Sequence, residues 1–141
     1  MNILIVSQYF WPEDFRINPV AQELSLRGHK VTVLTGVPNY PYGRVFPDYL
    51  AKPDSYSQFN SIKVIRVPML PRGKGYLSLS LNYLSFMLSA TVIGPFLLRG
   101  LKVDCVIVYQ LSPVTVVFPG YIISRIKKSR FIPWVQDLWP E

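Results

Sequence analysis

The sequence predicts an α/β fold built on a doubly wound, Rossmann-like parallel sheet. Short runs rich in Val, Ile and Leu, such as the uncharged residues 3–6, have the composition of strands that are buried on both faces, as parallel strands are. These runs alternate with segments of helical pattern, which is typical of β-α-β units joined by right-handed crossovers. The 141 residues suit one domain. Five strands are expected, at residues 3–6, 31–35, 62–68, 103–109 and 130–135.

Helix boundaries follow from capping residues. Asn18 and Pro19 mark the start of a first helix, and Arg27 with Gly28 mark its end. In the last third of the chain, Ser112 and Pro113 supply the N-cap and first position of a helix that runs to about Lys127. Strand, helix and strand therefore recur at both ends of the chain.

The segment between the second and third strands is rich in proline, with Pro38, Pro41, Pro47 and Pro53, and is expected to be a long irregular loop. Its aromatic side chains are expected to stack on a sugar or to pack as a lid; they are Tyr40, Tyr42, Phe46, Tyr49 and Tyr56. The following strand alternates apolar and basic residues like an exposed or edge-proximal strand. Lys63 and Arg66 are therefore expected outside the core.

Residues 75–98 carry no formal charge, and basic residues flank them on both sides: Arg72, Lys74, Arg99 and Lys102. Ser78, Asn82, Ser85 and Ser89 recur at helical spacing and form one uncharged polar stripe. Two interpretations stay open. Either the helix docks on a membrane surface with a basic rim, or it is a core helix whose serines face polar loops. The segment is long enough to cross a bilayer, but a transmembrane helix fits the polar stripe less well.

Composition limits the classes of partner. Fifteen basic residues against eight acidic ones give a net charge of +7, which favours a nucleic acid, a phospholipid surface or a phosphorylated ligand. Nucleic acid is disfavoured because no nucleic-acid-binding motif occurs. The start of the chain has strand sequence and no cleavable signal, so a cytoplasmic location is expected. Cys105, the single cysteine, is expected to be a buried apolar residue.

Open parallel sheets bind ligands beyond the carboxyl ends of their strands. Those ends correspond here to residues 7–16, 36–40, 69–74, 110–112 and 136–141. Together they supply hydrogen-bonding groups suited to hydroxyls and one cation suited to phosphate: Glu13, Asp14, Arg16, Asn39, Tyr40, Asp137 and Glu141.

Four motifs carry a family resemblance: QYFWPEDFRIN, RGHKVTVLTG, the PNYP-x-G loop and the final VQDLWPE. In this order and spacing they resemble the N-terminal domain of family-4-type retaining glycosyltransferases of the GT-B fold. Within this family the resemblance is to bacterial enzymes of surface-polysaccharide synthesis (O-antigen, capsule or exopolysaccharide). It is strongest to aminosugar transferases of the N-acetylfucosamine type. The resemblance covers the whole chain.

This resemblance implies a two-domain enzyme that is peripheral on the inner face of the plasma membrane. The N-terminal half binds a lipid-linked saccharide acceptor and the membrane, and a second Rossmann-like half holds a nucleotide sugar of the UDP-sugar type. The chain is then an incomplete N-terminal domain, expected to be inactive alone. Arg72, Lys74, Arg99 and Lys102 are the residues expected to dock on anionic lipid.

Among the site residues, Asp137 is the candidate for stabilising an oxocarbenium-like sugar centre, and its alternative role is a helix N-cap. Glu13, Asn39 and Tyr40 are expected to bind acceptor. The first loop lacks the glycine pair of many relatives, so Arg16 is expected to contact phosphate through its side chain, unless it is a solvated surface residue.

Gln136 stands where many relatives have histidine, and it is expected to hydrogen-bond a substrate hydroxyl without acting as a base. The sequence has no Asp-x-Asp, and its single histidine, His29, follows a helix-ending glycine in a turn position. No metal site and no cofactor are therefore expected.

Two other classes of function remain. One is a non-catalytic, membrane-docked subunit that recruits a separate donor-binding chain. The other is a dinucleotide-binding domain, which is disfavoured because no Gly-x-Gly-x-x-Gly follows the first strand.

Overall fold

The computed structural model describes residues 1–111 and 113–136, and its centre is a six-stranded sheet with the strand order β3-β4-β2-β1-β5-β6. The strands are β1 (Asn2–Val6), β2 (Lys30–Gly36), β3 (Gln58–Phe59), β4 (Ile62–Val67), β5 (Cys105–Gln110) and β6 (Arg130–Val135). Only β3 runs antiparallel to its neighbour; every other pairing is parallel. The predicted doubly wound parallel sheet is confirmed, with β3 as a strand that the sequence analysis missed.

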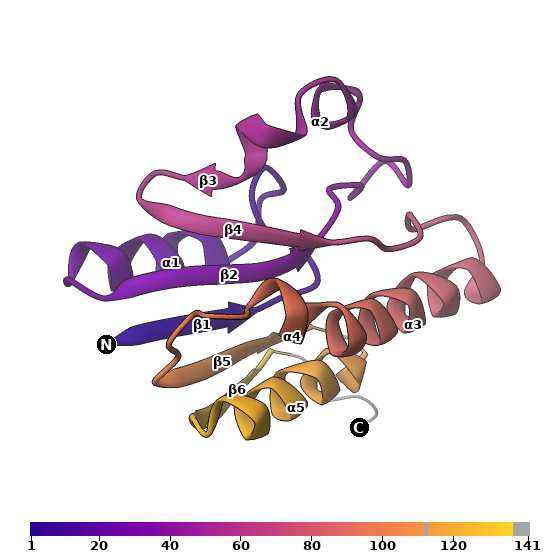
Figure 1. Ribbon diagram of the computed structural model, residues 1–141. Helices are drawn as coiled ribbons and strands as arrows, with labels where there is room; N and C mark the ends of the chain where they lie inside the picture. The colour runs from indigo at the N-terminus through magenta and orange to yellow at the C-terminus, as the bar shows by residue number, and fades with distance from the viewer. Residues whose placement is uncertain (112, 137–141) are drawn as a thin grey trace.

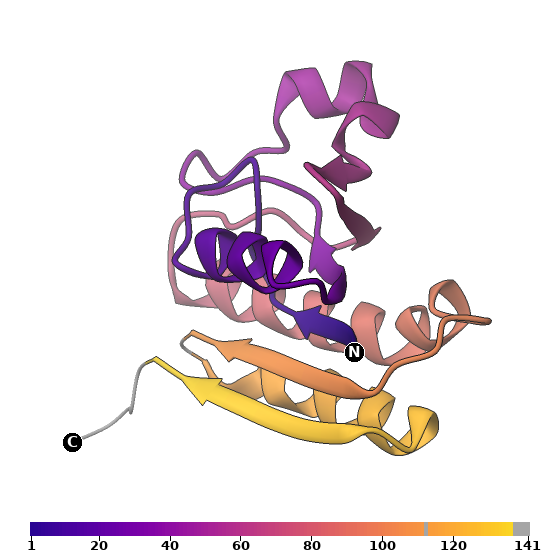
Figure 2. The same ribbon diagram turned by 90° about the vertical axis from the view of Figure 1, so that its left-hand side faces the viewer.

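Helices cover both faces of this sheet (Figures 1 and 2). They are α1 (Ile17–Leu26), α2 (Pro47–Ala51), α3 (Tyr76–Val92), α4 (Gly94–Leu97) and α5 (Val117–Lys127), with the 3₁₀ turns η1 (Pro53–Tyr56) and η2 (Val114–Val116). α1 lies on one face, and α3, α4 and α5 lie on the other. The chain steps from β1 to β2 in one direction and from β5 to β6 in the other, so right-handed crossovers place these helices on opposite faces.

Two apolar clusters flank the sheet because successive strand residues point to opposite faces. In β1, Leu4 and Val6 pack under α3 and α5, whereas Ile3 and Ile5 pack under α1. With apolar layers on both sides, the central strands have no room for charge. This burial explains the uncharged runs from which the strands were predicted.

The proline-rich segment is more ordered than predicted, since it contains α2 and η1. Each of these turns begins with a proline, Pro47 in α2 and Pro53 in η1. The first positions of a helix have no intrahelical N–H partner, so proline costs nothing there and its fixed φ favours the turn. The prolines therefore start short helices here instead of preventing them.

The expectation for Arg66 was wrong. Lys63 is exposed as predicted, but the Arg66 guanidinium folds inward and donates hydrogen bonds to the backbone carbonyls of Gly36 (2.8 Å) and Trp11. Alternation along a strand indicates which face a side chain leaves from, but it does not show that a loop folds over that face.

Residues 75–98 form α3 and α4, and the polar stripe faces the protein interior. Asn82 is fully buried; its Oδ1 accepts hydrogen bonds from Gln8 Nε2 and the Tyr9 hydroxyl (both 2.8 Å). Its Nδ2 donates to the carbonyl of Leu70 (2.6 Å), and Ser85 Oγ accepts from the Leu70 N–H (2.9 Å). The stripe thus binds the loop that follows β4, and the choice between the two interpretations depends on the opposite side of the helix.

The opposite side of these helices is apolar and uncovered. We call it the apolar face of α3 and α4, and it consists of Tyr76, Leu77, Leu81, Leu84, Leu88, Val92, Phe96 and Leu97. Tyr76, at the start of α3, is 92% exposed. In the part of the chain that the structure describes, no helix has the length and apolar character needed to cross a bilayer.

Replacing Asn82→Ala is expected to lower the free energy of unfolding by about 3 kcal/mol, because the buried groups of Gln8 and Tyr9 and the part-buried carbonyl of Leu70 lose their partner. Urea unfolding measures this change. Ser80→Ala on the exposed side of α3 is the matched control, with an expected change below about 0.5 kcal/mol. Equal effects of the two variants would contradict the buried network.

Candidate ligand site at the carboxyl edge of the sheet

Three loops meet at the carboxyl ends of β1, β2 and β4, and the Glu13 carboxylate joins the first two. Glu13 lies in the loop after β1 and is only 3% exposed. Its Oε1 accepts hydrogen bonds from the backbone N–H groups of Asn39 (2.8 Å) and Tyr40 (2.7 Å), which follow β2. Two backbone N–H groups on one carboxyl oxygen fix the loop after β2 to the loop after β1.

Asn39 extends the connection to the third loop. Its fully buried side chain accepts a hydrogen bond at Oδ1 from the backbone N–H of Arg72 (2.8 Å), in the loop between β4 and α3. Its Nδ2 donates to the carbonyl of Val37 (2.9 Å). We call Glu13 and Asn39 the rim clasp, because together they hold the loops after β1, β2 and β4 in one arrangement.

The second oxygen of the Glu13 carboxylate, Oε2, is buried and has no hydrogen-bond partner among residues 1–111 and 113–136. Burial raises the pKa of Glu13 above the usual range of a carboxyl group, and the N–H groups of Tyr40 and Asn39 only partly offset this effect. The folded protein therefore keeps a proton on this carboxyl group up to a higher pH than the unfolded chain does.

Aromatic side chains pack behind the clasp. Tyr40 contacts Phe15 and Tyr9, with ring centroids 5.3 and 5.6 Å apart. The Arg72 guanidinium lies over the Tyr40 ring, 5.4 Å from its centroid, in a cation–π contact. Burial raises the pKa of the Tyr9 hydroxyl, which stays protonated and donates to Asn82. The rim is thus rigidly backed by the helix α3.

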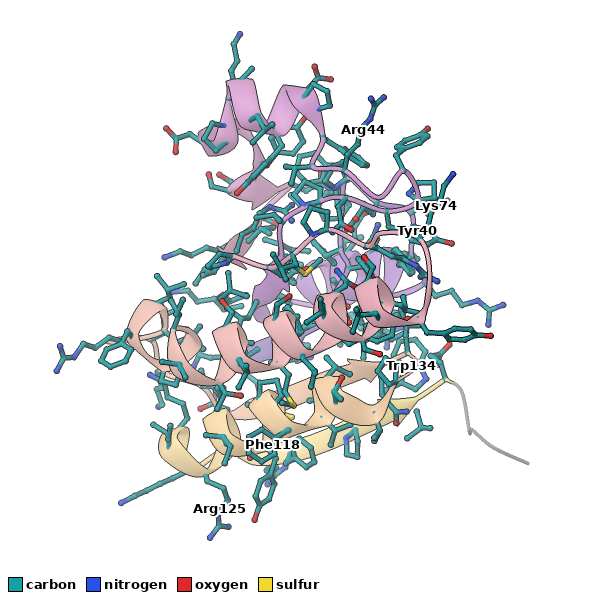
Figure 3. The ribbon with its side chains drawn as sticks, turned by 90° about the vertical axis from the view of Figure 1, so that its right-hand side faces the viewer. Tyr40, Arg44, Lys74, Phe118, Arg125 and Trp134 are labelled. Atoms are coloured by element: carbon teal, nitrogen blue, oxygen red, sulfur yellow. The ribbon has the colours of Figure 1, made fainter. Side chains whose placement is uncertain are left out.

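A cavity of about 310 Å³ opens at this rim, lined by Pro41, Tyr42, Gly43, Arg72, Gly73 and Lys74. Gly43 has φ +67°, and a Cβ atom there would stand 2.3 Å from the carbonyl oxygen of Arg72. Glycine therefore lets the two loops approach closely. Figure 3 shows Tyr40 and Lys74 in the same corner of the molecule, beside the start of α3. Two basic side chains and several backbone groups are positioned to contact an anion with attached hydroxyls.

The structure brings some of the predicted site residues together and leaves others apart. Glu13, Asn39 and Tyr40 meet in the rim clasp, as their strand-end positions predicted. Arg16 is exposed at the N-cap position of α1, and its side chain makes no capping hydrogen bond. Gln136 follows β6 and donates its backbone N–H to the Gln110 carbonyl (3.0 Å).

Asp137 and Glu141 lie outside the described residues, as does the predicted N-cap Ser112. Of the predicted membrane-docking residues, Lys74, Arg99 and Lys102 are exposed, whereas Arg72 is half-buried against Tyr40.

Gln8, Tyr9 and Asn82 support the rim from below and were not predicted as site residues. Asn82 was predicted only as part of a polar stripe, whose spacing gives no indication of partners in loops 12 to 74 residues away. Among the residues that the structure describes, no three His, Cys, Asp or Glu side chains gather closely enough to hold a metal ion.

Comparison with solved structures gives the class of fold as α/β and Rossmann-like, in agreement with the mostly parallel sheet. Two neighbours represent the similarity. The C-terminal domain of the PF1911 hydrogenase from Pyrococcus furiosus superposes with a TM-score of 0.61 at 18% identity, covering 94% of this chain and 89% of that domain. MurG from Acinetobacter baumannii superposes with a TM-score of 0.50, also at 18% identity.

The alignment with MurG covers 94% of this chain but only 34% of MurG, so the chain spans about a third of that protein. No protein-family description matches the sequence, and no curated protein matches it closely enough to count as a relative. At these identities the neighbours establish the fold, and the argument for function rests on the site.

The free energy of unfolding of the Glu13→Gln variant is expected to increase relative to that of the unchanged chain as pH rises above the ordinary carboxyl pKa of 4.5. The pKa of Glu13 is raised in the folded state, so its contribution to stability is complete below pH 4.5 and is lost as pH rises through the folded pKa. Glutamine keeps an acceptor oxygen for Asn39 and Tyr40 but never ionises.

The measurement is the difference in unfolding free energy between the two proteins across the pH range, from urea titrations. Gln22→Ala, at an exposed position of α1 without an ionisable group, is the control, and its effect on the unfolding free energy should be the same at every pH. The raised pKa of Glu13 would be contradicted if the unchanged chain became more stable than Glu13→Gln as pH rises.

Proposed function

We propose that this chain is the acceptor-binding and membrane-docking half of a glycosyltransferase that moves a sugar from a nucleotide-sugar donor to a lipid-linked saccharide. The observation that supports this proposal most strongly is the position of the polar rim at one end of the apolar face of α3 and α4. A substrate with a charged, hydroxyl-rich head and a long apolar tail requires such a pair of adjacent surfaces.

The geometry at the start of α3 supports this assignment. Arg72 and Lys74 line the rim cavity, and the exposed Tyr76 and Leu77 follow within three residues. In the proposed complex the cations contact the phosphate groups of the lipid carrier, and the saccharide extends toward the rim clasp. The lipid tail then leaves toward the apolar face.

The apolar face itself is proposed to dock on the membrane surface. A helix of 17 residues is about 25 Å long, and the exposed basic side chains stand at its two ends. Lys74 lies near the ligand rim, and Arg99 with Lys102 follow α4 at the opposite end of the sheet. A helix that lies along an anionic surface combines apolar contact with such flanking cations. The proposed location is therefore peripheral, on the inner face of the plasma membrane.

The fold comparison is compatible with this function. This chain has the fold of a part of MurG, a glycosyltransferase, and that likeness concerns the fold alone. Donor binding is proposed to reside in a second Rossmann-like half, either joined to this chain or in a separate partner chain.

The remaining features are carried by the sequence resemblance and are proposed with it. They are a retaining, metal-independent reaction with an aminosugar donor of the UDP-sugar type, no cofactor, a place in O-antigen, capsule or exopolysaccharide synthesis, and a role for Asp137 in stabilising the oxocarbenium-like centre. Arg16 and Gln136 are proposed to contact substrate through their side chains.

Vesicle flotation tests both parts of the proposal with three lipid compositions: neutral phospholipid, phospholipid with phosphatidylglycerol, and the latter with a polyprenyl-diphosphate-linked N-acetylglucosamine. We expect little binding to the first, salt-sensitive binding to the second and tighter binding to the third. Leu84→Gln with Leu88→Gln should weaken binding to all anionic vesicles. Leu26→Gln, at a leucine on α1 across the sheet that is more exposed than either Leu84 or Leu88, is the control and should leave binding unchanged.

Equal binding to the second and third vesicles would contradict the acceptor assignment while leaving membrane docking intact. Binding that is insensitive to the Leu84 and Leu88 changes would contradict the docking surface.

A further inference from the structure

A second pocket lies away from the rim cavity, between the loop after β1 and the segment of α2 and η1. Its volume is about 490 Å³, and it is lined by Trp11, Asp48, Ala51, Lys52, Ser55 and Tyr56. Ligand sites in proteins have volumes of roughly 300 to 1,000 Å³. The rings of Trp11 and Tyr56 form one wall, which we call the aromatic shelf.

The aromatic shelf is built from rings that pack on one another. The centroids of Trp11 and Tyr56 are 5.3 Å apart with their planes at 32°, and Phe59 of β3 packs on Trp11 at 5.5 Å. Tyr49 meets Tyr56 edge to face at 5.6 Å. Because the rings contact each other, they leave no slot between them for a flat ligand. They offer a one-sided apolar platform.

Arg66 holds this platform in place from β4. Its guanidinium donates hydrogen bonds to the carbonyls of Trp11 and Gly36 and lies 5.5 Å from the centroid of the Tyr49 ring. The backbone of Trp11 is thereby fixed to the end of β2, and Tyr49 is fixed over the same cation. A platform that is ordered before a ligand arrives loses less entropy on binding.

The other side chains at the pocket suit hydroxyl groups. Asp48 offers acceptor oxygens, and Lys52 and Ser55 offer donors. Asp48 and Lys52 form no ion pair with one another or with any other residue in the described ranges. Their hydrogen-bonding capacity faces solvent at the pocket.

We propose that the aromatic shelf binds a hexopyranose unit of a saccharide. The C–H face of a pyranose ring packs on Trp11 and Tyr56, and its hydroxyls reach Asp48, Lys52 and Ser55. A nucleobase is the competing occupant, because bases also stack on a single aromatic face. The polar groups of Asp48, Lys52 and Ser55 around the shelf favour a ligand with several hydroxyls. This inference rests on the proposed function, since the same loop carries Trp11 and the clasp residue Glu13. The sugar proposed for the aromatic shelf is a unit of the acceptor saccharide other than the one that receives the transferred sugar.

NMR titration of the ¹⁵N-labelled chain tests the proposal through the indole N–H of Trp11. The probes are N-acetylglucosamine, methyl glucoside and uridine. We expect a saturable shift of the Trp11 signal with at least one hexose, in the millimolar range typical of ligands with so few atoms. Uridine should leave the signal unchanged.

Variants locate the binding at the pocket. Trp11→Ala should abolish the shifts of pocket amides, and Asp48→Ala, which leaves the aromatic shelf intact, should weaken binding several-fold. Phe118→Ala, an exposed aromatic residue on α5, is the matched control and should bind as the unchanged chain does. Asp48→Ala also keeps the test decisive if Trp11→Ala fails to fold.

The absence of any saturable Trp11 shift with both hexoses would overturn the proposal, and so would a response to uridine alone. These outcomes are separate from those of the vesicle experiment. If vesicles with the lipid-linked saccharide recruit the chain while Trp11 stays silent, the aromatic shelf is refuted and the proposed function stands. If the Trp11 signal responds to a hexose while the lipid-linked saccharide does not increase vesicle binding, the aromatic shelf stands and the proposed function is refuted.

Discussion

The arrangement of the ligand edge depends on one buried carboxylate. The hydrogen bonds from Asn39 and Tyr40 to Glu13 join the loops after β1 and β2, and Asn39 carries the connection to Arg72 in the loop before α3. Without this rim clasp, the three loops would be separate surface segments with no common shape. The burial that raises the pKa of Glu13 is the cost of placing one acceptor between two backbone donors.

The clasp also relates the polar and apolar surfaces to each other. The Arg72 N–H is held by Asn39, and Asn82 holds the Leu70 carbonyl two residues earlier, so the start of α3 cannot shift relative to the rim. The apolar face of α3 and α4 therefore begins where the rim cavity ends. This adjacency, more than either surface alone, favours an amphiphilic substrate over a soluble one.

Much of the fold was predictable because burial on both sheet faces leaves a direct trace in the sequence. The runs around Ile5, Val33 and Val106 are uncharged for that reason, and the strand ends then indicated where Glu13 and Asn39 would meet. Arg66 and Asn82 were not predictable in the same way. Their partners, the carbonyls of Trp11 and Leu70, are backbone groups of loops, whose positions depend on tertiary packing and leave no periodic pattern.

Amide hydrogen exchange of Asn39, Tyr40 and Arg72 tests the rim clasp most directly, because these three N–H groups are the donors that hold it. If the account is correct, all three exchange as slowly as the strand amides of Leu4 and Val33, since they open only when the whole sheet unfolds. Exchange as fast as that of the neighbouring exposed Arg44 would show three loops that move independently, and would contradict the account.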